Sequence, residues 1–282
     1  MVDATQTASK AAARITVISA DANPNQGTAD LIAGLRLYPL WSRLALHEVR
    51  QRFRRSLLGP LWLTLSMGIW VAAMGFVFSA LFHQNAGQTL PYIAIGVIFW
   101  SLLTSSINEG TSVFIGNEGF IRNVPLPLSV HVFRMLARNL IIWAFNMVIY
   151  VAVLVFFGIL PNANLFWFFP GFALFMINAA WMALAAAILS TRFRDIPQVI
   201  ANVIQVVFFL TPVFWSLESL PNRPAFVVFN PFYHLLEVVR APLLGQAPAV
   251  SSWGFDIGLA VVGVAATLLL YRRAFARIAY WV

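Results

Sequence analysis

Residues 59–82 read GPLWLTLSMGIWVAAMGFVFSALF and contain no charged side chain. A helix of about 20 apolar residues crosses the hydrocarbon core of a bilayer. The whole chain of 282 residues is 60% hydrophobic and 10% charged, whereas soluble domains are about one quarter charged. The sequence therefore predicts an all-α integral membrane protein.

Five further apolar runs are long enough to cross a bilayer. The alternative, buried helices of a soluble protein, is improbable because so many uncharged runs of this length rarely occur in one short soluble chain. They cover residues 90–108, 140–160, 165–189, 196–217 and 250–271, the last broken by Asp256. We therefore predict six transmembrane helices in a single domain, 31–282. Residues 1–30 contain no signal-like apolar run, and residues 21–30 have no apolar periodicity and little to bury, so we expect a flexible cytoplasmic tail there.

The basic residues are distributed unevenly over the predicted loops. Lys and Arg number 18 against 10 Asp and Glu, and 16 of the 18 fall on one side of the six predicted spans. This asymmetry follows the positive-inside rule and places both termini in the cytoplasm. Because topology accounts for the basic residues, nucleic-acid binding is not expected.

Residues 39–56 are predicted to form an amphipathic helix in the headgroup layer. Pro39 suits the first turn of a helix, and basic side chains recur at helical spacing opposite Trp41, Ala45 and Val49. Such a stripe would face anionic lipid, although a solvated basic flank is the alternative. The stripe consists of Arg43, His47, Arg50 and Arg54.

Two other segments invite a role besides connection. Residues 114–139 form the longest predicted cytoplasmic loop, and apolar side chains beside charges there favour a docking surface over a plain connector. Residues 218–252 contain two apolar pieces too short to span, which fit either re-entrant half-helices or an extracytoplasmic cap. Within them Glu237 and Arg240 are three residues apart and can pair on one helical face.

The fifth predicted span carries three amides and an aromatic ring on one face. They recur at intervals of four, three and four residues as Gln198, Asn202, Gln205 and Phe209. Intramembrane amides are costly against lipid, so this face either packs against another helix or lines a polar path.

Several kinds of chemistry lack their residues in this chain. It has no cysteine and no GxxxxGK[ST] motif, and its four histidines stand apart in the sequence. We therefore expect no catalytic, cofactor or metal site, and no ATP hydrolysis by this chain.

The sequence resembles the ABC-2 type permeases that export O-antigen, capsule and teichoic-acid polymers with an ABC ATPase. The resemblance covers the chain from about residue 37 onward, and the order of its motifs is more specific than any one of them. They are QRFRRSLLGPLW at 51–62, RNVPLP at 122–127, FRDI at 193–196, TPVFW at 211–215, NPF at 230–232 and RAPLLG at 240–245.

This resemblance implies a homodimer in the bacterial inner membrane, with two ATPase subunits that bind ATP and Mg, and a lipid-linked polysaccharide as cargo. The residues implied for ATPase coupling are Glu118, Phe120, Ile121, Arg122, Asn123, Arg194 and Asp195. Those assigned to the polymer path are Trp62, Gln198, Asn202, Gln205, Phe209 and Trp215. Those assigned to an outer gate are Asn230, Pro231, Glu237 and Arg240.

Two other functions compete with polysaccharide export. An exporter of drugs or small lipids keeps the same fold and changes the cargo. A membrane-embedded glycosyl- or acyltransferase needs acidic or histidine residues gathered at the membrane face, and the sequence does not group them there.

Overall fold

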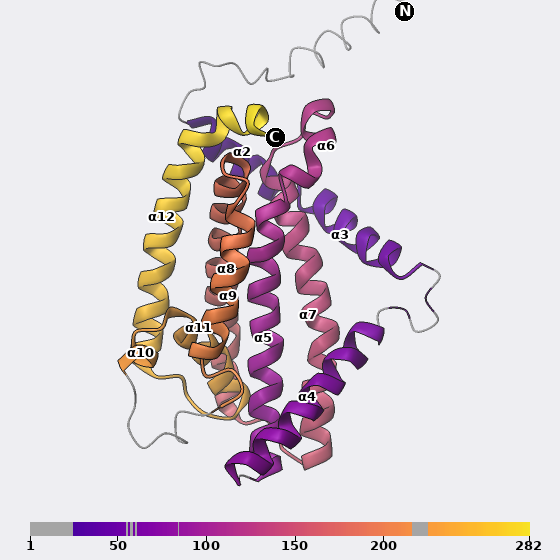
Figure 1. The fold of residues 1–282 in the computed structure, drawn as a ribbon, viewed down its shortest axis with the longest axis vertical. Coiled ribbons are helices and arrows are strands. Elements are labelled where there is room, and N and C mark those ends of the chain that lie inside the picture. Colours follow the sequence, from indigo (N-terminus) through magenta and orange to yellow (C-terminus); the bar gives the residue numbers. More distant parts are fainter. Residues whose placement is uncertain (1–24, 55, 57–58, 60, 84, 216–224) are drawn as a thin grey trace, which may run out of the picture.

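The structure, a computed structural model, describes residues 25–54, 56, 59, 61–83, 85–215 and 225–282 (Figure 1). In these ranges the regular elements are all helical, as predicted. The first six are α2 (Asn25–Arg36), α3 (Tyr38–Arg52), α4 (Leu61–Phe82), α5 (Ala86–Ser112), η1 (Ile115–Asn117) and α6 (Glu118–Asn123). The others are α7 (Ser129–Phe157), η2 (Ala163–Trp167), α8 (Phe168–Arg192), α9 (Ile196–Leu210), α10 (Ala225–Val228), α11 (Pro231–Leu243) and α12 (Val250–Trp281).

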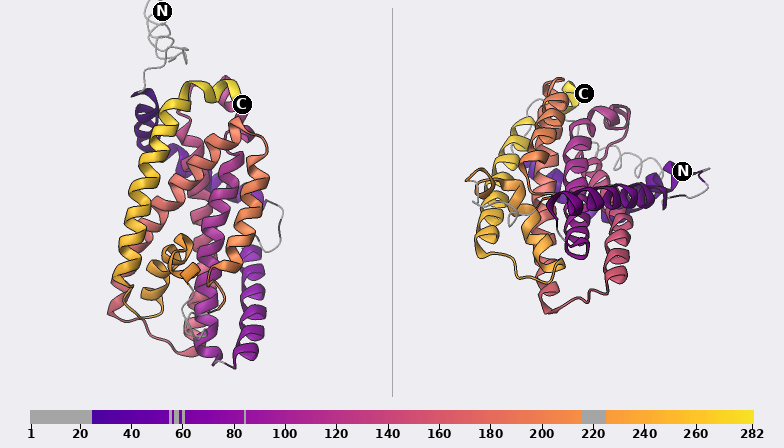
Figure 2. Two further views of the ribbon diagram at one scale, coloured as in Figure 1. Left: turned by 60° about the vertical axis from the view of Figure 1, so that its left-hand side comes forward. Right: turned by 60° about the horizontal axis from the view of Figure 1, so that its bottom comes forward.

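Five segments of the described chain are long and apolar enough to cross a membrane. They are α4, α5, α7, η2 with α8, and α12. Helices α5, α7, α8 and α12 run along the long axis, and α4 crosses α5 and α7 at a slant (Figure 1). Helices α2 and α6 and the last turn of α12 lie at one end, the α6 end, while α10 and α11 lie toward the other, the α11 end (Figures 1 and 2).

Helix α5 is the centre of the bundle and contacts α4, α7, α8, α9 and α11. It is buried almost continuously from Ile93 to Leu103. Two of its glycines permit close approach, because a Cβ on Gly96 would stand 2.3 Å from the carbonyl oxygen of Val213, and one on Gly110 would stand 2.7 Å from that of Ala183. Small residues at such contacts are typical of packed membrane helices.

Helix α9 is shorter than the span predicted over 196–217. It has 15 residues and ends at Leu210, followed by an extended Thr211. The extended backbone is expected there because Pro212 comes next. At roughly 1.5 Å per residue the helix measures about 22 Å, less than the ~30 Å of a bilayer core. Because α8 ends and α12 begins at opposite ends of the bundle (Figure 1), the chain between them passes from one end to the other. The count of six transmembrane helices stays a prediction.

Several other predicted boundaries are corrected by the structure. Helix α7 begins at Ser129 instead of residue 140, so the second half of the predicted loop 114–139 is helical. Helix α12 continues to Trp281, beyond the predicted 271. In both cases the helix extends past its uncharged part into a segment that contains arginines. Hydropathy identifies the part of a helix that is apolar enough to lie in the hydrocarbon core. It does not show where the backbone hydrogen bonds of that helix begin or end.

The predicted tail is also too long, because α2 begins at Asn25 and Asp30 is buried. Residues 1–24 lie outside the described residues. Helix α3 has the exposed basic stripe of Arg43, His47 and Arg50, while Arg54 follows its end.

The apolar side of α3 packs partly against protein. Ala45 and Val49 are buried, and α3 contacts α7. A position of α3 in the headgroup layer stays a prediction, as does a re-entrant path of α10 and α11. Helix α11 itself packs among α5, α8 and α12.

Candidate functional site

The predicted coupling residues lie at the α6 end of the molecule. Glu118, Phe120, Arg122 and Asn123 are exposed on α6 and Ile121 is half-buried. Glu118 and Arg122 form an ion pair of 2.9 Å, one helical turn apart. Asn123 donates to the carbonyl oxygen of Gly119. Helix α6 thus presents a charged surface with an exposed phenylalanine.

The last residues of α12 connect α6 with the turn between α8 and α9. Arg122 donates to a backbone oxygen of Val282 at 2.8 Å, and Arg194 donates to the carbonyl oxygen of Trp281 at 3.1 Å. The guanidinium of Arg192 stands 5.1 Å from the centre of the Trp281 ring. Asp195 is exposed beside them. The two predicted coupling segments therefore share a junction that sequence reasoning missed.

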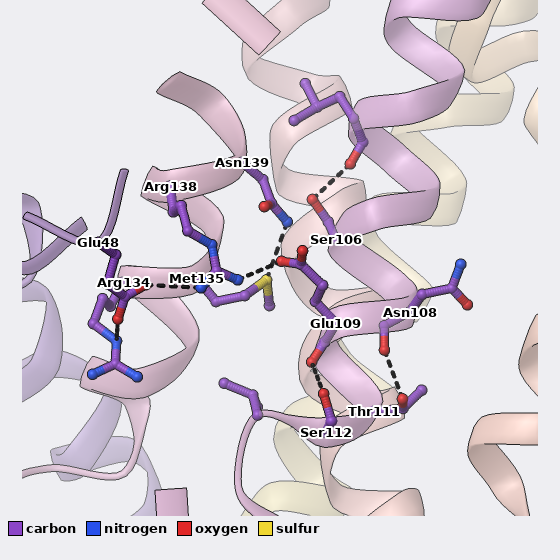
Figure 3. Close-up of polar contacts among 12 residues, drawn as sticks. Glu48, Ser106, Asn108, Glu109, Thr111, Ser112, Arg134, Met135, Arg138 and Asn139 are labelled. Carbon is purple, nitrogen blue, oxygen red and sulfur yellow. Dashed lines mark hydrogen bonds and ion pairs between the residues drawn. The ribbon is translucent and has the colours of Figure 1, made fainter. Parts of the chain in front are cut away.

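A charge network that was not predicted joins α3, α5 and α7 (Figure 3). Glu48 of α3 pairs with Arg134 at 2.9 Å and with Arg138 at 2.8 Å, both on α7. Arg138 also pairs with Glu109 at the end of α5. Arg134 donates to Asn117, the residue before α6. Movement of any of these four segments changes an ion pair or hydrogen bond to another.

Asp30 holds α2 against two transmembrane helices. Its carboxylate accepts hydrogen bonds from the backbone N–H groups of Leu128 and Ser129, at 2.8 and 3.0 Å, and from the hydroxyl of Tyr271 at 2.7 Å. The first two groups belong to the N-terminus of α7, where a negative charge is favourable. The hydroxyl of Ser129 donates back to the carbonyl oxygen of Asp30. Sequence reasoning did not predict this arrangement because the partners are distant in the chain.

The predicted gate residues converge at the α11 end. Asn230 caps α11 and also donates to the hydroxyl oxygen of Thr211, which follows α9. Arg240 is 1% exposed, donates to the carbonyl oxygen of Pro212 at 2.7 Å, and stands 3.6 Å from Glu237. Pro231 occupies the first turn of α11. Residues 211 and 212 are thus tied to α11.

Tyr92 of α5 completes this group. The Arg240 guanidinium lies 4.1 Å from the centre of the Tyr92 ring. The single O–H of Tyr92 is shared between the carbonyl oxygens of Pro212 and Trp215, at 3.2 and 3.1 Å. Tyr92 was not predicted. The motifs at 211–215 and 230–232 placed two of the three segments, whereas no pattern in the sequence pointed to α5.

The predicted path residues on α9 share its outer face. Gln198, Asn202, Gln205 and Phe209 are all exposed, and Gln198 donates to Asn202 at 3.2 Å. The opposite face of α9 packs on the core through residues such as Ile204 and Phe208. Trp62 is exposed near the start of α4, and Trp215 is half-buried beyond α9. Within the described residues, no hydrogen bond or ring contact joins Trp62 to the amide face.

Nothing in the described part of the chain gathers three histidine or acidic side chains into a metal-sized group. The arrangement offers an exposed charged surface at one end, a buried polar group at the other, and an amide face between them.

The family model that describes the ABC-2 type transporter matches residues 40–244, most of the chain. The chain belongs to the ABC-2 type transporter family. Together with the five apolar helices described above, this membership identifies it as a multi-pass membrane protein.

Three relatives carry names that state a cargo. The O-antigen export system permease protein RfbA of Myxococcus xanthus is 22% identical over 202 residues, which cover 70% of this chain and 77% of the relative. A permease of the same name from Klebsiella pneumoniae is 19% identical over 191 residues, 67% and 74% of the two chains. The polysialic acid transport protein KpsM of Escherichia coli is 21% identical over 235 residues, 80% and 88% of the two chains.

Proposed function

We propose that this chain is the membrane subunit of an ABC exporter that moves a lipid-linked polysaccharide across the bacterial inner membrane. The observation that carries this proposal is the agreement between a family match over residues 40–244 and relatives named for O-antigen and polysialic acid export. The ATP and Mg are bound by a separate ATPase subunit.

The proposed assembly is a homodimer with two ATPase subunits at the α6 end and both termini in the cytoplasm. The uneven distribution of arginine supports that orientation. Helix α6 supports the docking role because Phe120 and the Glu118–Arg122 pair are exposed together. The chain crosses the membrane six times, with α9 and the segment that follows it making the fifth crossing.

The amide face of α9 is the proposed wall of the polymer path. Its three amides are exposed on an apolar helix, and such groups are costly against lipid. A second subunit across a polar path removes that cost, and amides and rings offer a glycan many weak, replaceable contacts. Transport needs such contacts, because a site that holds the polymer tightly stops it.

The proposed cycle begins when ATP binding draws the two ATPases together and displaces α6. The junction at Trp281 passes this displacement to the turn between α8 and α9. Because residues 211 and 212 after α9 are held by Asn230 and Arg240, a shift of α9 acts on the α11 end. That end opens and the glycan advances.

Two experiments test the proposal. Deletion of the gene is expected to remove surface polysaccharide and leave drug sensitivity unchanged, and the affinity-tagged chain is expected to co-purify with an ABC ATPase. The opposite phenotype would indicate a drug or small-lipid exporter. Purified chain that modifies a lipid-linked sugar without an ATPase would indicate a transferase.

The polymer path has its own test. Replacing Asn202 or Gln205 by leucine is expected to lower export several-fold while the purified protein stays folded, since each change removes an exposed amide from α9. Val203→Leu on the same helix is the matched control. Full export in both amide variants would assign these residues to helix packing.

A further inference from the structure

A cavity of about 470 Å³ lies between α4, α5 and α7. Its walls include Ser66 and Trp70 of α4, Ser101 of α5, and Asn139, Trp143 and Asn146 of α7. Most of these residues lie well inside candidate membrane spans. The volume falls within the range of about 300–1,000 Å³ that is usual for small-ligand sites.

Two polar atoms among the lining side chains lack partners. Nε1 of Trp143 and Oδ1 of Asn146 are buried and form no hydrogen bond within the described residues. Three residues apart on α7, they lie on one helical face. Buried polar groups are almost always satisfied, and leaving them unpaired in a membrane is costly. Both residues line the cavity, although protein atoms cover Nε1 and Oδ1 themselves. A side-chain rotation that turns them toward a bound ligand would give the indole N–H an acceptor and the amide oxygen a donor.

The other lining groups narrow the class of ligand. Serine hydroxyls and the Asn139 amide make the walls polar, while Trp70 and Trp143 add flat rings. An acyl chain has no polar atom that could form a hydrogen bond with the Asn139 or Asn146 amide. An anionic headgroup calls for a cluster of cations, but the charged lining residues are one arginine, Arg52, and one carboxylate, Glu109. A hydroxyl both donates and accepts, and a sugar ring combines several hydroxyls with an apolar face that suits an indole.

The cavity has an approach from the α6 end. A second cavity of about 590 Å³ is lined by residues of the charge network, including Glu48, Arg134 and Arg138. Both cavities are lined by Arg52 and Glu109. Glu109 therefore lies where the two cavities adjoin, and Figure 3 shows it paired with Arg138 of the charge network.

We propose that the cavity between α4, α5 and α7 binds a single uncharged sugar unit that enters from the α6 end. Its assignment to the exported glycan rests on the proposed function. The site lies within one subunit and is distinct from the amide face of α9. It holds one unit of the glycan near the cytoplasmic side while the rest of the polymer stays outside.

Photolabelling tests the proposal directly. The full chain is placed in nanodiscs of phosphatidylethanolamine and phosphatidylglycerol and exposed to decyl β-glucoside with a diazirine on the sugar. Mass spectrometry is expected to find the label on α4, α5 and α7 at cavity residues, and excess decyl maltoside is expected to compete. A decyl phosphocholine probe with the same diazirine reports labelling by lipid headgroups.

Matched variants identify the contacts. Trp143→Phe keeps an aromatic ring and removes the N–H, and Asn146→Leu removes the amide. Each is expected to lower labelling about fivefold, which corresponds to ~1 kcal/mol. Ser79→Ala on α4 lies outside the cavity lining and is expected to label like the unchanged protein. Size-exclusion chromatography confirms that each variant is folded.

Three results would overturn the proposal: equal labelling by the phosphocholine probe, labels on other helices, or unchanged labelling in both cavity variants. Surface polysaccharide in the deletion strain separates the two proposals. Loss of the polysaccharide together with an unlabelled cavity would reject the sugar site and leave the export function standing. Retained polysaccharide with a labelled cavity would support the sugar site and reject the export function.

Discussion

The two ends of the molecule use charge in different ways. At the α6 end, Glu118 and Arg122 pair on the surface with 48% and 56% of their side chains exposed. At the α11 end, Arg240 is 1% exposed and is held by a carbonyl oxygen, an aromatic ring and a partly buried carboxylate. Exposed ion pairs contribute little stability and are available to a partner, whereas a buried arginine fixes its neighbours. The difference separates an exposed charged surface, which we propose as the docking site, from a buried polar junction.

The largest expected effect comes from Arg240→Met at the α11 end. The change removes the hydrogen bond to Pro212 and the contact with Tyr92 and leaves Glu237 without its cation. We expect the free energy of unfolding in mixed detergent micelles to fall by about 3 kcal/mol. Glu237→Gln is the matched control, since Glu237 is partly exposed and 3.6 Å away. Its loss is expected to be about 1 kcal/mol or less. Equal losses would contradict the central position assigned to Arg240.

The second prediction tests whether a buried polar side chain also stabilises the α6 end. Asp30→Ala leaves two backbone N–H groups at the start of α7 and the hydroxyl of Tyr271 without their acceptor. We expect a loss of about 2 kcal/mol in the same unfolding assay. Thr28→Ala removes an exposed hydrogen bond on the same helix, and it is expected to cost a few tenths of a kcal/mol. A small effect of Asp30→Ala would mean that α2 is loosely attached.

The contacts of Asp30 show which interactions could not be predicted from the sequence. Its partners lie 98, 99 and 241 residues away, and Glu48 and Arg138 are 90 residues apart. Neither contact leaves a periodic pattern in the chain, because each depends on which helices are neighbours. Glu48 is an acidic residue in an otherwise basic helix because it pairs with Arg134 and Arg138 of α7.

Local patterns were more informative. Charge-free runs located the cores of five spans, and the spacing of Glu237 and Arg240 correctly predicted their pairing. The early end of α9 was readable from the sequence, since Thr211 precedes a proline. The helical period correctly predicted that the three amides of α9 share one face, whereas the role of that face depends on a second subunit and stays a prediction.

A smaller effect is expected from Trp281→Ala at the junction between the two predicted coupling segments. The variant loses the ring contact with Arg192 and keeps the backbone carbonyl that accepts from Arg194. We expect a stability change of about 1 kcal/mol or less, together with reduced stimulation of the partner ATPase by the permease. Tyr280→Ala, which removes an exposed neighbouring ring, is the control. Unchanged stimulation in Trp281→Ala would mean that the two segments move independently.

The smallest effect on stability is expected from Glu118→Arg on α6. The ion pair is exposed, so the loss is expected to be a few tenths of a kcal/mol, including repulsion from Arg122 one turn away. Co-purification of the ATPase is nevertheless expected to drop, because the charge at the first residue of the proposed docking surface is reversed. The double exchange Glu118→Arg with Arg122→Glu separates two causes, since it restores the pair within α6 but not the original pattern. If the double variant still loses the ATPase, the partner reads the charges themselves. If it recovers the ATPase, the ion pair matters because it stabilises α6, and the partner does not recognise the individual charges. The pair would then have a structural role, as Arg240 has at the α11 end, although it is exposed.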